Sequence, residues 1–348
     1  MTTRKFLRSQ AAGLIAVVAI GMPRLAQCES PPHAPESSAP ALRDAAYWPF
    51  SASSPWNTSL GANASYVKIE SPGFSANGGA NLNVTNWSYP VFIASETDPI
   101  RGFYWRDSNE LIARMRAPDQ ARADRQSDGS LIIINDAHDT DVEMWQARRR
   151  PNGDWDASVT VRHNLRGAGF YEDYQGIRAG GMSALGGLIR REELIRRKIP
   201  HVLAVAVDGS AMNRNAPGGN PFVWPASWAD GGDGDDYGTS GNLYMGSLLA
   251  IPPEVDLRRL KLSPQGQAVA QALQDYGAYV VDQGSANIIY YVEPSAHDVL
   301  ATSAAELGRL TPLLRVVTNN SPLNVGGGGT TRRVAAPAPP LPNNPLGN

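Results

Sequence analysis

The stretch Leu131-Ile-Ile-Ile-Asn135-Asp-Ala-His-Asp-Thr140-Asp-Val-Glu-Met-Trp145 joins an unbroken apolar run to a run in which polar and apolar residues alternate. A short apolar run is typical of a buried strand, and alternation with a period of two is typical of a strand with two different faces. Asn, Asp and His between the two runs are residues that favour turns. This stretch therefore predicts two strands of a β-sheet.

Short runs of the same kind recur through the first half of the chain, each bounded by Gly, Pro, Asn or Asp. Their spacing favours a β-sandwich or jelly roll. The 34 glycines and 27 prolines imply many turns, which argues against a helical bundle or solenoid. The predicted strands are Tyr66–Glu70, Tyr89–Ala94, Leu131–Asn135, Val142–Ala147 and Ser158–His163.

Two segments have helical periodicity, so we expect helices packed on this β-rich domain. Met182–Arg197 places leucine and isoleucine side chains near one face. Ser263–Tyr276 begins with an N-cap serine and a first-turn proline and is followed by glycine. The extended runs that follow the helices are His201–Val207, Ala278–Asp282 and Asn287–Val292, the last two as a predicted hairpin.

The two ends of the chain differ in composition from its middle. Residues 1–28 combine basic residues with an apolar run too short to span a membrane, which predicts an export signal and a periplasmic or extracellular location. Leu25–Cys28 also resembles a bacterial lipobox, whose cysteine carries a lipid. Residues 29–44 then form a flexible linker, 45–318 one β-rich domain, and the Gly- and Pro-rich residues 319–348 a disordered tail.

Charge and cysteine content exclude several classes of protein. Lys and Arg number 31 against 33 Asp and Glu, so the net charge of -2 provides no broad positive field for nucleic acid or an anionic membrane. A single cysteine cannot form an intramolecular disulfide framework or a Cys-rich zinc site. We therefore expect no nucleic-acid partner, no transmembrane span and no required cofactor.

The alternating run carries the first candidate site. An extended chain from residue 139 to 145 would place Asp139, Asp141, Glu143 and Trp145 on one face. Neighbouring carboxylates raise one another's pKa, which lets one act as an acid while another stays ionised. Paired carboxylates of this kind carry out glycoside hydrolysis. An exposed acidic strand face or a cation site is the alternative interpretation.

This row resembles the E-x-D-x-E strand of laminarinase-like and xyloglucan-active jelly-roll glycosidases. The resemblance covers about seven residues and implies that Asp139 is the nucleophile, Asp141 its supporting carboxylate and Glu143 the acid/base. Aspartate stands at the first position where that family has glutamate. The shorter side chain changes the carboxyl separation, on which the stereochemical outcome depends.

A second candidate site is the glycine-rich stretch 167–181, which contains adjacent acids, two tyrosines and an arginine. Glycines let a backbone approach a ligand closely, although the acids could also satisfy the backbone of a plain turn. Its candidate catalytic residues are Glu172 and Asp173. Its candidate substrate-binding residues are Tyr171, Tyr174 and Arg178, together with His138 and Trp145 from the first site.

Together with residues 48–57 and 199–204, the stretch 167–181 is similar to a family of secreted bacterial proteins. The residues that carry this resemblance are Trp48-Pro-Phe50, Ser54-Pro-Trp-Asn57 and Ile199-Pro-His-Val-Leu-Ala204. It implies export and a single domain, and it supplies no activity.

Two further features concern ligands. Asp230, Asp233, Asp235 and Asp236 stand among glycines and offer the oxygen ligands that Ca²⁺ prefers, so we expect a possible structural calcium site; a plain acidic turn is the alternative. Tryptophans in loop-like contexts could stack on sugar rings. A basic cluster could be a solvated face or bind an acidic polysaccharide; its residues are Arg101, Arg106, Arg114, Arg116, Arg122 and Arg125.

These features predict a secreted carbohydrate-active enzyme, a glycoside hydrolase whose partner is a polysaccharide or oligosaccharide. A polysaccharide lyase on a uronic-acid polymer is one alternative, in which Tyr171 or Tyr174 and His163 or His138 would handle the proton while Arg178 neutralises the uronic carboxylate. A non-catalytic carbohydrate-binding protein with aromatic platforms is the other.

Overall fold

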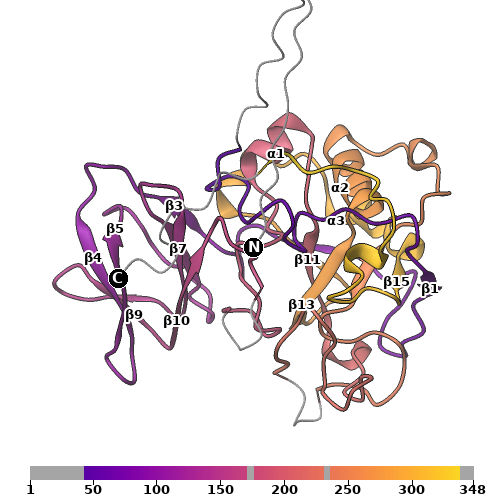
Figure 1. Ribbon diagram of the computed structural model, residues 1–348, viewed down its shortest axis with the longest axis horizontal. Helices are drawn as coiled ribbons and strands as arrows, with labels where there is room; N and C mark the ends of the chain where they lie inside the picture. Colours follow the sequence, from indigo (N-terminus) through magenta and orange to yellow (C-terminus); the bar gives the residue numbers. More distant parts are fainter. Residues whose placement is uncertain (1–42, 171–175, 231–235, 338–348) are drawn as a thin grey trace, which may run out of the picture. The chain divides into compact units, whose positions relative to one another are not determined.

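The computed structural model describes residues 43–170, 176–230 and 236–337, which all belong to one compact unit of the chain, Pro40–Asn348. Strands predominate over helices among them and form one seven-stranded and two four-stranded sheets (Figure 1). The prediction of a mainly β, sandwich-like fold with packed helices is confirmed. The predicted export signal and most of the predicted linker lie outside the described residues.

The two four-stranded sheets enclose the smaller of two hydrophobic cores, which contains Phe103, Val142, Met144 and Trp155. One sheet has the order β10-β7-β6-β3 and the other β5-β4-β9-β8. The first consists of β3 (Val91–Ile93), β6 (Leu131–Ile134), β7 (Thr140–Trp145) and β10 (Val159–Asn164). The second consists of β4 (Ile100–Trp105), β5 (Leu111–Arg116), β8 (Arg148–Arg149) and β9 (Trp155–Ala157).

Strand β6 is buried on both faces, which explains why its sequence has no polar residue. Leu131 and Ile133 pack in the smaller core, whereas Ile132 and Ile134 pack in the larger one. Side chains alternate between the faces of a strand, so four consecutive apolar residues supply two different cores. The first four-stranded sheet is therefore the layer between the two cores.

The seven-stranded sheet is mixed and has the order β1-β15-β12-β13-β11-β14-β2. Its central strands β11 and β13 run parallel (Figure 1). Two of its strands come from the first half of the chain, β1 (Tyr66–Lys68) and β2 (Asn81–Asn83). The others are β11 (Leu203–Asp208), β12 (Leu248–Ala250), β13 (Ala278–Gly284), β14 (Ile289–Tyr291) and β15 (Arg315–Val317).

In the part of the chain that the structure describes, three α-helices accompany the sheets: α1 (Arg191–Arg196), α2 (Pro264–Asp275) and α3 (Ala304–Gly308). Short 3₁₀ helices are η1 (Gly209–Ala211), η2 (Leu257–Leu260), η3 (Pro294–Ala296), η4 (Thr311–Leu313) and η5 (Val325–Gly327). The N-cap of α2 is confirmed, because the Ser263 side chain accepts a hydrogen bond from the Gly266 N–H. Within the described part of the chain, no helix is both long and apolar enough to cross a membrane.

The predicted helix Met182–Arg197 is wrong in its first half, since α1 begins only at Arg191. The backbone before α1 has partners outside the segment. The N–H groups of Ala184 and Leu185 donate to the Glu143 carboxylate, and the Ile189 N–H donates to the Tyr291 carbonyl. These tertiary bonds replace the local ones that a helix requires.

The predicted hairpin of Ala278–Asp282 with Asn287–Val292 is also wrong, although both strands exist. Strand β11 lies between β13 and β14, parallel to β13 and antiparallel to β14. The short link between β13 and β14 therefore crosses one strand of the sheet. The apolar residues at every position of β11 except its last, Asp208, explain its preference for this central position, where a strand is covered on both sides.

The prediction of a disordered tail from residue 319 is wrong for the residues that the structure describes. Gly61 forms an antiparallel bridge with Thr331, and the Arg333 side chain forms an ion pair of 2.8 Å with Asp275. The Arg332 guanidinium donates to the Gln274 carbonyl at 2.6 Å. Composition alone missed this C-terminal strap (residues 319–333), because its hydrogen bonds and ion pairs reach distant parts of the chain. Some of these hydrogen bonds are made by the backbone of its own glycines.

Substitution of Gly61 tests whether the strap stabilises the domain. A Cβ atom at Gly61 would overlap the backbone carbonyl of Gly328, whereas a Cβ at Gly79 would meet no atom within 4 Å. We expect Gly61→Ala to lower the free energy of unfolding by about 1–3 kcal/mol. Gly79→Ala is the matched control and should leave it nearly unchanged in the same denaturant titration. Equal stability of the two variants would contradict the packing of the strap.

Candidate functional site

Asp139 does not belong to the predicted row of carboxylates. It lies in the bend before β7, where its carboxylate accepts hydrogen bonds from the Asn135 amide at 2.8 Å and the Thr140 hydroxyl at 3.0 Å. The neighbouring His138 has a positive φ of 54°, and its Nδ1 lies 2.9 Å from the Asp44 carboxylate. Both residues therefore stabilise this turn, and the nucleophile role that the resemblance implied for Asp139 has no support from its position.

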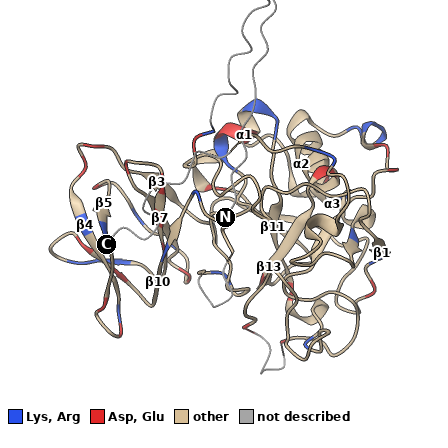
Figure 2. Ribbon diagram, viewed as in Figure 1, with Lys and Arg blue, Asp and Glu red and all other residues tan. Residues whose placement is uncertain are grey.

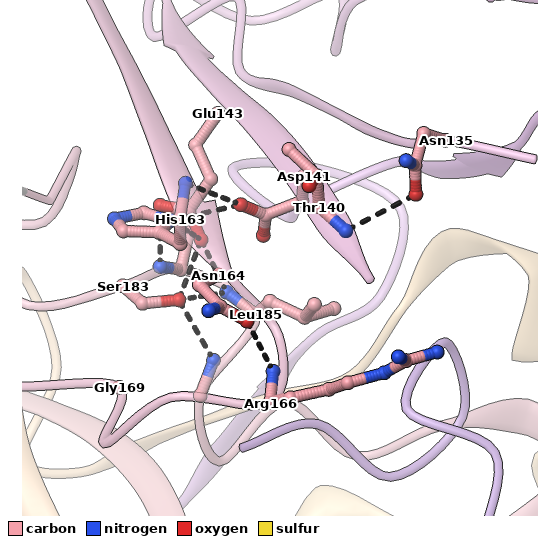
Figure 3. Close-up of polar contacts among 12 residues, drawn as sticks. Asn135, Thr140, Asp141, Glu143, His163, Asn164, Arg166, Gly169, Ser183 and Leu185 are labelled. Atoms are coloured by element: carbon pink, nitrogen blue, oxygen red, sulfur yellow. Dashed lines mark hydrogen bonds and ion pairs between the residues drawn. The ribbon is translucent and has the colours of Figure 1, made fainter. Parts of the chain in front are cut away.

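Asp141 and His163 form a buried pair across two neighbouring strands. They are directly opposite in the register of β7 and β10, with His163 Nδ1 2.9 Å from Asp141 Oδ1 (Figure 3). The His163 backbone N–H also donates to that oxygen at 3.2 Å. Burial raises the pKa of Asp141 to about 6, although the nearby His163 acts in the opposite direction.

Glu143 is the anchor of the segment before α1. Its carboxylate accepts hydrogen bonds from the Ser183 hydroxyl at 2.6 Å and from the N–H groups of Ala184 at 2.8 Å and Leu185 at 3.0 Å (Figure 3). Asp141 and Glu143 are both 0% exposed. The alternative of an exposed acidic strand face is therefore wrong, and neither carboxylate is open to a substrate, because β7 turns this face toward the larger core.

Asp141, Glu143 and His163 each place one possible ligand atom within 4.8 Å of the others, so the group could hold a metal ion. His163 Nδ1 lies 3.6 Å from Glu143 Oε1. His163 Nδ1 already bonds to Asp141 Oδ1, and the Ser183 hydroxyl to Glu143 Oε1, as hydrogen-bonded buried charges usually do. Asp141 Oδ2 is buried without a hydrogen-bond partner among the described residues. The hydrogen bonds give the group a structural role, whether or not an ion is bound.

Arg178 holds the other side of the segment that Glu143 anchors. Its Nη1 donates to the Gly186 carbonyl at 2.8 Å and its Nη2 to the Ala184 carbonyl at 2.6 Å. The guanidinium carbon lies 5.0 Å and 5.1 Å from the ring centroids of Tyr89 and Tyr291. Because Arg178 is 0% exposed, it positions other groups, and the predicted direct contact with a substrate carboxylate is not supported.

The buried Arg178 acts on Asp282, a half-buried residue near the end of β13 that the sequence analysis took only as the last residue of a strand. Burial and the negative charge of Asp230 raise the pKa of Asp282, against the opposing charge of Arg178, to about 7. Such a carboxyl group is partly protonated at neutral pH. A pKa shifted by burial and a specific charged neighbour is a common property of functional groups.

Other polar groups complete the surroundings of Asp282. The charge of Asp128 also acts on it, and the Trp145 side chain donates a hydrogen bond to Asp128. Asp230 is exposed, and its Oδ1 accepts a hydrogen bond of 2.8 Å from the Tyr237 hydroxyl. Arg178 and Asp230, from two separately predicted stretches, thus act on the charge of Asp282, and Trp145 is linked to it only through Asp128.

Several predicted site residues lie outside the described residues. They are Tyr171, Glu172, Asp173 and Tyr174 of the second candidate site and Asp233 and Asp235 of the calcium site. Asp236 is described and exposed. The calcium site therefore remains a prediction. A polar residue at the end of an otherwise apolar strand was the available sequence signal for Asp282.

Comparison with known proteins gives no assignment, because no family model, curated protein or solved structure matches the chain. The arrangement of side chains therefore carries the functional argument.

Replacement of Glu143 tests its role as an anchor. In Glu143→Gln an amide N–H₂ would face donors that now bond to a carboxylate oxygen, and an unsatisfied buried group costs about 1–3 kcal/mol. We expect a corresponding loss in the free energy of unfolding. Glu110→Gln, at an exposed position, is the control. Unchanged stability of Glu143→Gln, measured by denaturant titration, would rule out the anchor role.

Proposed function

We propose that the chain is a secreted carbohydrate-active enzyme, a glycoside hydrolase in which Asp282 is the proton-transferring group and Asp230 its carboxylate partner. The proposal rests on one observation: beside a buried arginine, the negative charge of Asp230 acts on Asp282, whose pKa is held near 7. Hydrolysis of a glycosidic bond requires one carboxyl group as acid and one ionised carboxylate.

The environments of the two carboxylates suit different tasks. Asp282 is half-buried and favours the protonated form, so it can donate a proton to the leaving oxygen. Asp230 is exposed and bonded to the Tyr237 hydroxyl, so it can orient or activate a water molecule. Different environments for two carboxyl groups are the usual way in which an enzyme assigns acid and base roles.

Aromatic side chains supply surfaces for a sugar. Trp145 is half-buried and bonded to Asp128, and Trp228, two residues before Asp230, is 52% exposed. The apolar face of a sugar ring stacks on such rings while its hydroxyls reach polar neighbours. These residues are our candidates for substrate contact.

Tyr89 and Tyr291, the two tyrosines packed on Arg178, are unsuited to act as the base of a lyase. Tyr171 and Tyr174 of the lyase alternative lie outside the described residues. Burial raises the pKa of Tyr89, and that of Tyr291 lies well above its ordinary value for the same reason. A lyase base must lose its proton readily, which these phenols resist. His163 is buried and paired with Asp141, so it is equally unsuited to meet a substrate.

Activity of an Asp282 variant tests the proposal. A panel of polysaccharides is screened with the full chain for new reducing ends, and the most active substrate is then used for the variants. We expect Asp282→Asn to lower turnover by about 10²–10⁴-fold. In the wild type, turnover should fall as pH rises through about 7, because the acid then loses its proton.

Asp107→Asn, at an exposed position away from this group, should retain activity. Folded Asp282→Asn with wild-type turnover would overturn the assignment. New ultraviolet absorbance from an unsaturated product would replace hydrolysis by elimination.

A further inference from the structure

A second region of the described chain has the geometry of a ligand site. A cleft of about 970 Å³ is bordered by α1 and the residues after it, by α2, and by residues from both ends of the described chain. None of the residues placed around Asp282 lines it. Figure 2 shows basic segments on both sides of a short acidic one at α1. The basic residues that line the cleft are Arg43, Arg190, Arg196, Arg197, Lys198 and Arg333.

Three of the four acidic residues that line this cleft already lie against a basic side chain. Asp44 lies 2.9 Å from His138, Glu193 2.9 Å from His201, and Asp275 2.8 Å from Arg333. These pairs leave fewer carboxylates than cations free to act on a ligand.

Three of the basic residues have no such partner. Within the described residues, no carboxylate lies within ion-pair distance of Arg196, Arg197 or Lys198, and all three are exposed. Glu192 remains as a nearby acid. The mouth of the cleft therefore carries a local excess of positive charge on a protein whose net charge is -2.

Arg43 provides an independent indication of a ligand. It is 7% exposed, and its Nε and Nη1 have no hydrogen-bond partner, while its Nη2 donates to the Phe50 carbonyl. Its guanidinium carbon lies 4.4 Å from the centroid of the Trp48 ring. Buried N–H donors without acceptors are costly, and a guanidinium fork matches the two oxygens of a carboxylate.

Aromatic side chains beside these cations indicate the class of ligand. Trp48 and Tyr47 both line the cleft, and Tyr47 is 42% exposed. A sugar ring can stack on them while its carboxylate meets a guanidinium. Nucleic acid fits less well, because it needs a broad positive surface to bind its phosphates and the cations here are confined to one cleft.

We propose that this cleft binds an acidic oligosaccharide through its uronic carboxylates. The inference goes beyond the proposed hydrolase activity, because it assigns a separate site and a charged class of sugar. This cleft also takes the place of the basic cluster in the sequence as the candidate site for an acidic polysaccharide, because Arg101, Arg106 and Arg116 of that cluster form ion pairs with aspartates. The paired aspartates reduce the net positive charge that those arginines present to a ligand.

Calorimetric titration with oligogalacturonate tests the proposal, and the fully methyl-esterified oligomer is the neutral comparison. The triple variant Arg196→Gln, Arg197→Gln, Lys198→Gln should weaken binding of the acid form by about tenfold or more, since charge-assisted contacts are lost. The control removes three other exposed charges, at Arg258, Arg259 and Lys261, and should bind like the wild type. Arg43→Met should weaken binding as well.

The exposed positions of the triple variant keep the test valid even if Arg43→Met fails to fold. Equal affinity for the acidic and esterified oligomers, equal loss in both triple variants, or tighter binding of a DNA oligonucleotide would each overturn the proposal. Asp282→Asn should bind oligogalacturonate like the wild type. A failed hydrolase assignment can therefore be distinguished from a failed binding site.

Discussion

The buried carboxylate of Glu143 is the interaction on which the arrangement of this domain depends. Strand β7 presents Val142 and Met144 to the smaller core and Glu143 to the larger one. There the Glu143 carboxylate accepts hydrogen bonds from the Ser183 hydroxyl and from two backbone N–H groups. The two N–H groups belong to a segment with helical periodicity that does not form a helix. One carboxylate thus joins the inner sheet of the sandwich to the chain that leads into α1.

The same segment connects this anchor to the candidate active site. Glu143 binds N–H groups of residues 184 and 185, and Arg178 binds the carbonyl groups of residues 184 and 186. The negative charge of Glu143 and the positive charge of Arg178 thus fix the segment from two sides. The carbonyl groups of the segment in turn fix the Arg178 guanidinium beside the rings of Tyr89 and Tyr291. The fixed positive charge near Asp282 limits a rise in pKa that burial and Asp230 cause. The buried charges that hold the fold are therefore linked, through one short loop, to the group that we propose as the acid.

Local sequence patterns located strands such as β6, β7, β10 and β11, because apolar runs and period-two alternation are local properties, but they did not predict β4 and β5. They placed Asp141, Glu143 and Trp145 on one face of β7, yet could not tell that this face is buried, since burial depends on residues 40 positions later. Met182–Arg190 failed as a helix for the same reason. Asp282 was missed as a site because its chemistry arises from Asp230 and Arg178, which only the fold brings near it.

The most direct test of this account is the pKa of Asp282 in the folded chain. Carboxyl carbon NMR of the aspartate-labelled protein, assigned with Asp282→Asn, would follow its titration. We predict a midpoint near pH 7 in the wild type, and a lower midpoint in Asp230→Asn, because the negative charge that raises the pKa is removed. A midpoint near 4, the ordinary value of an aspartate, would contradict the central claim.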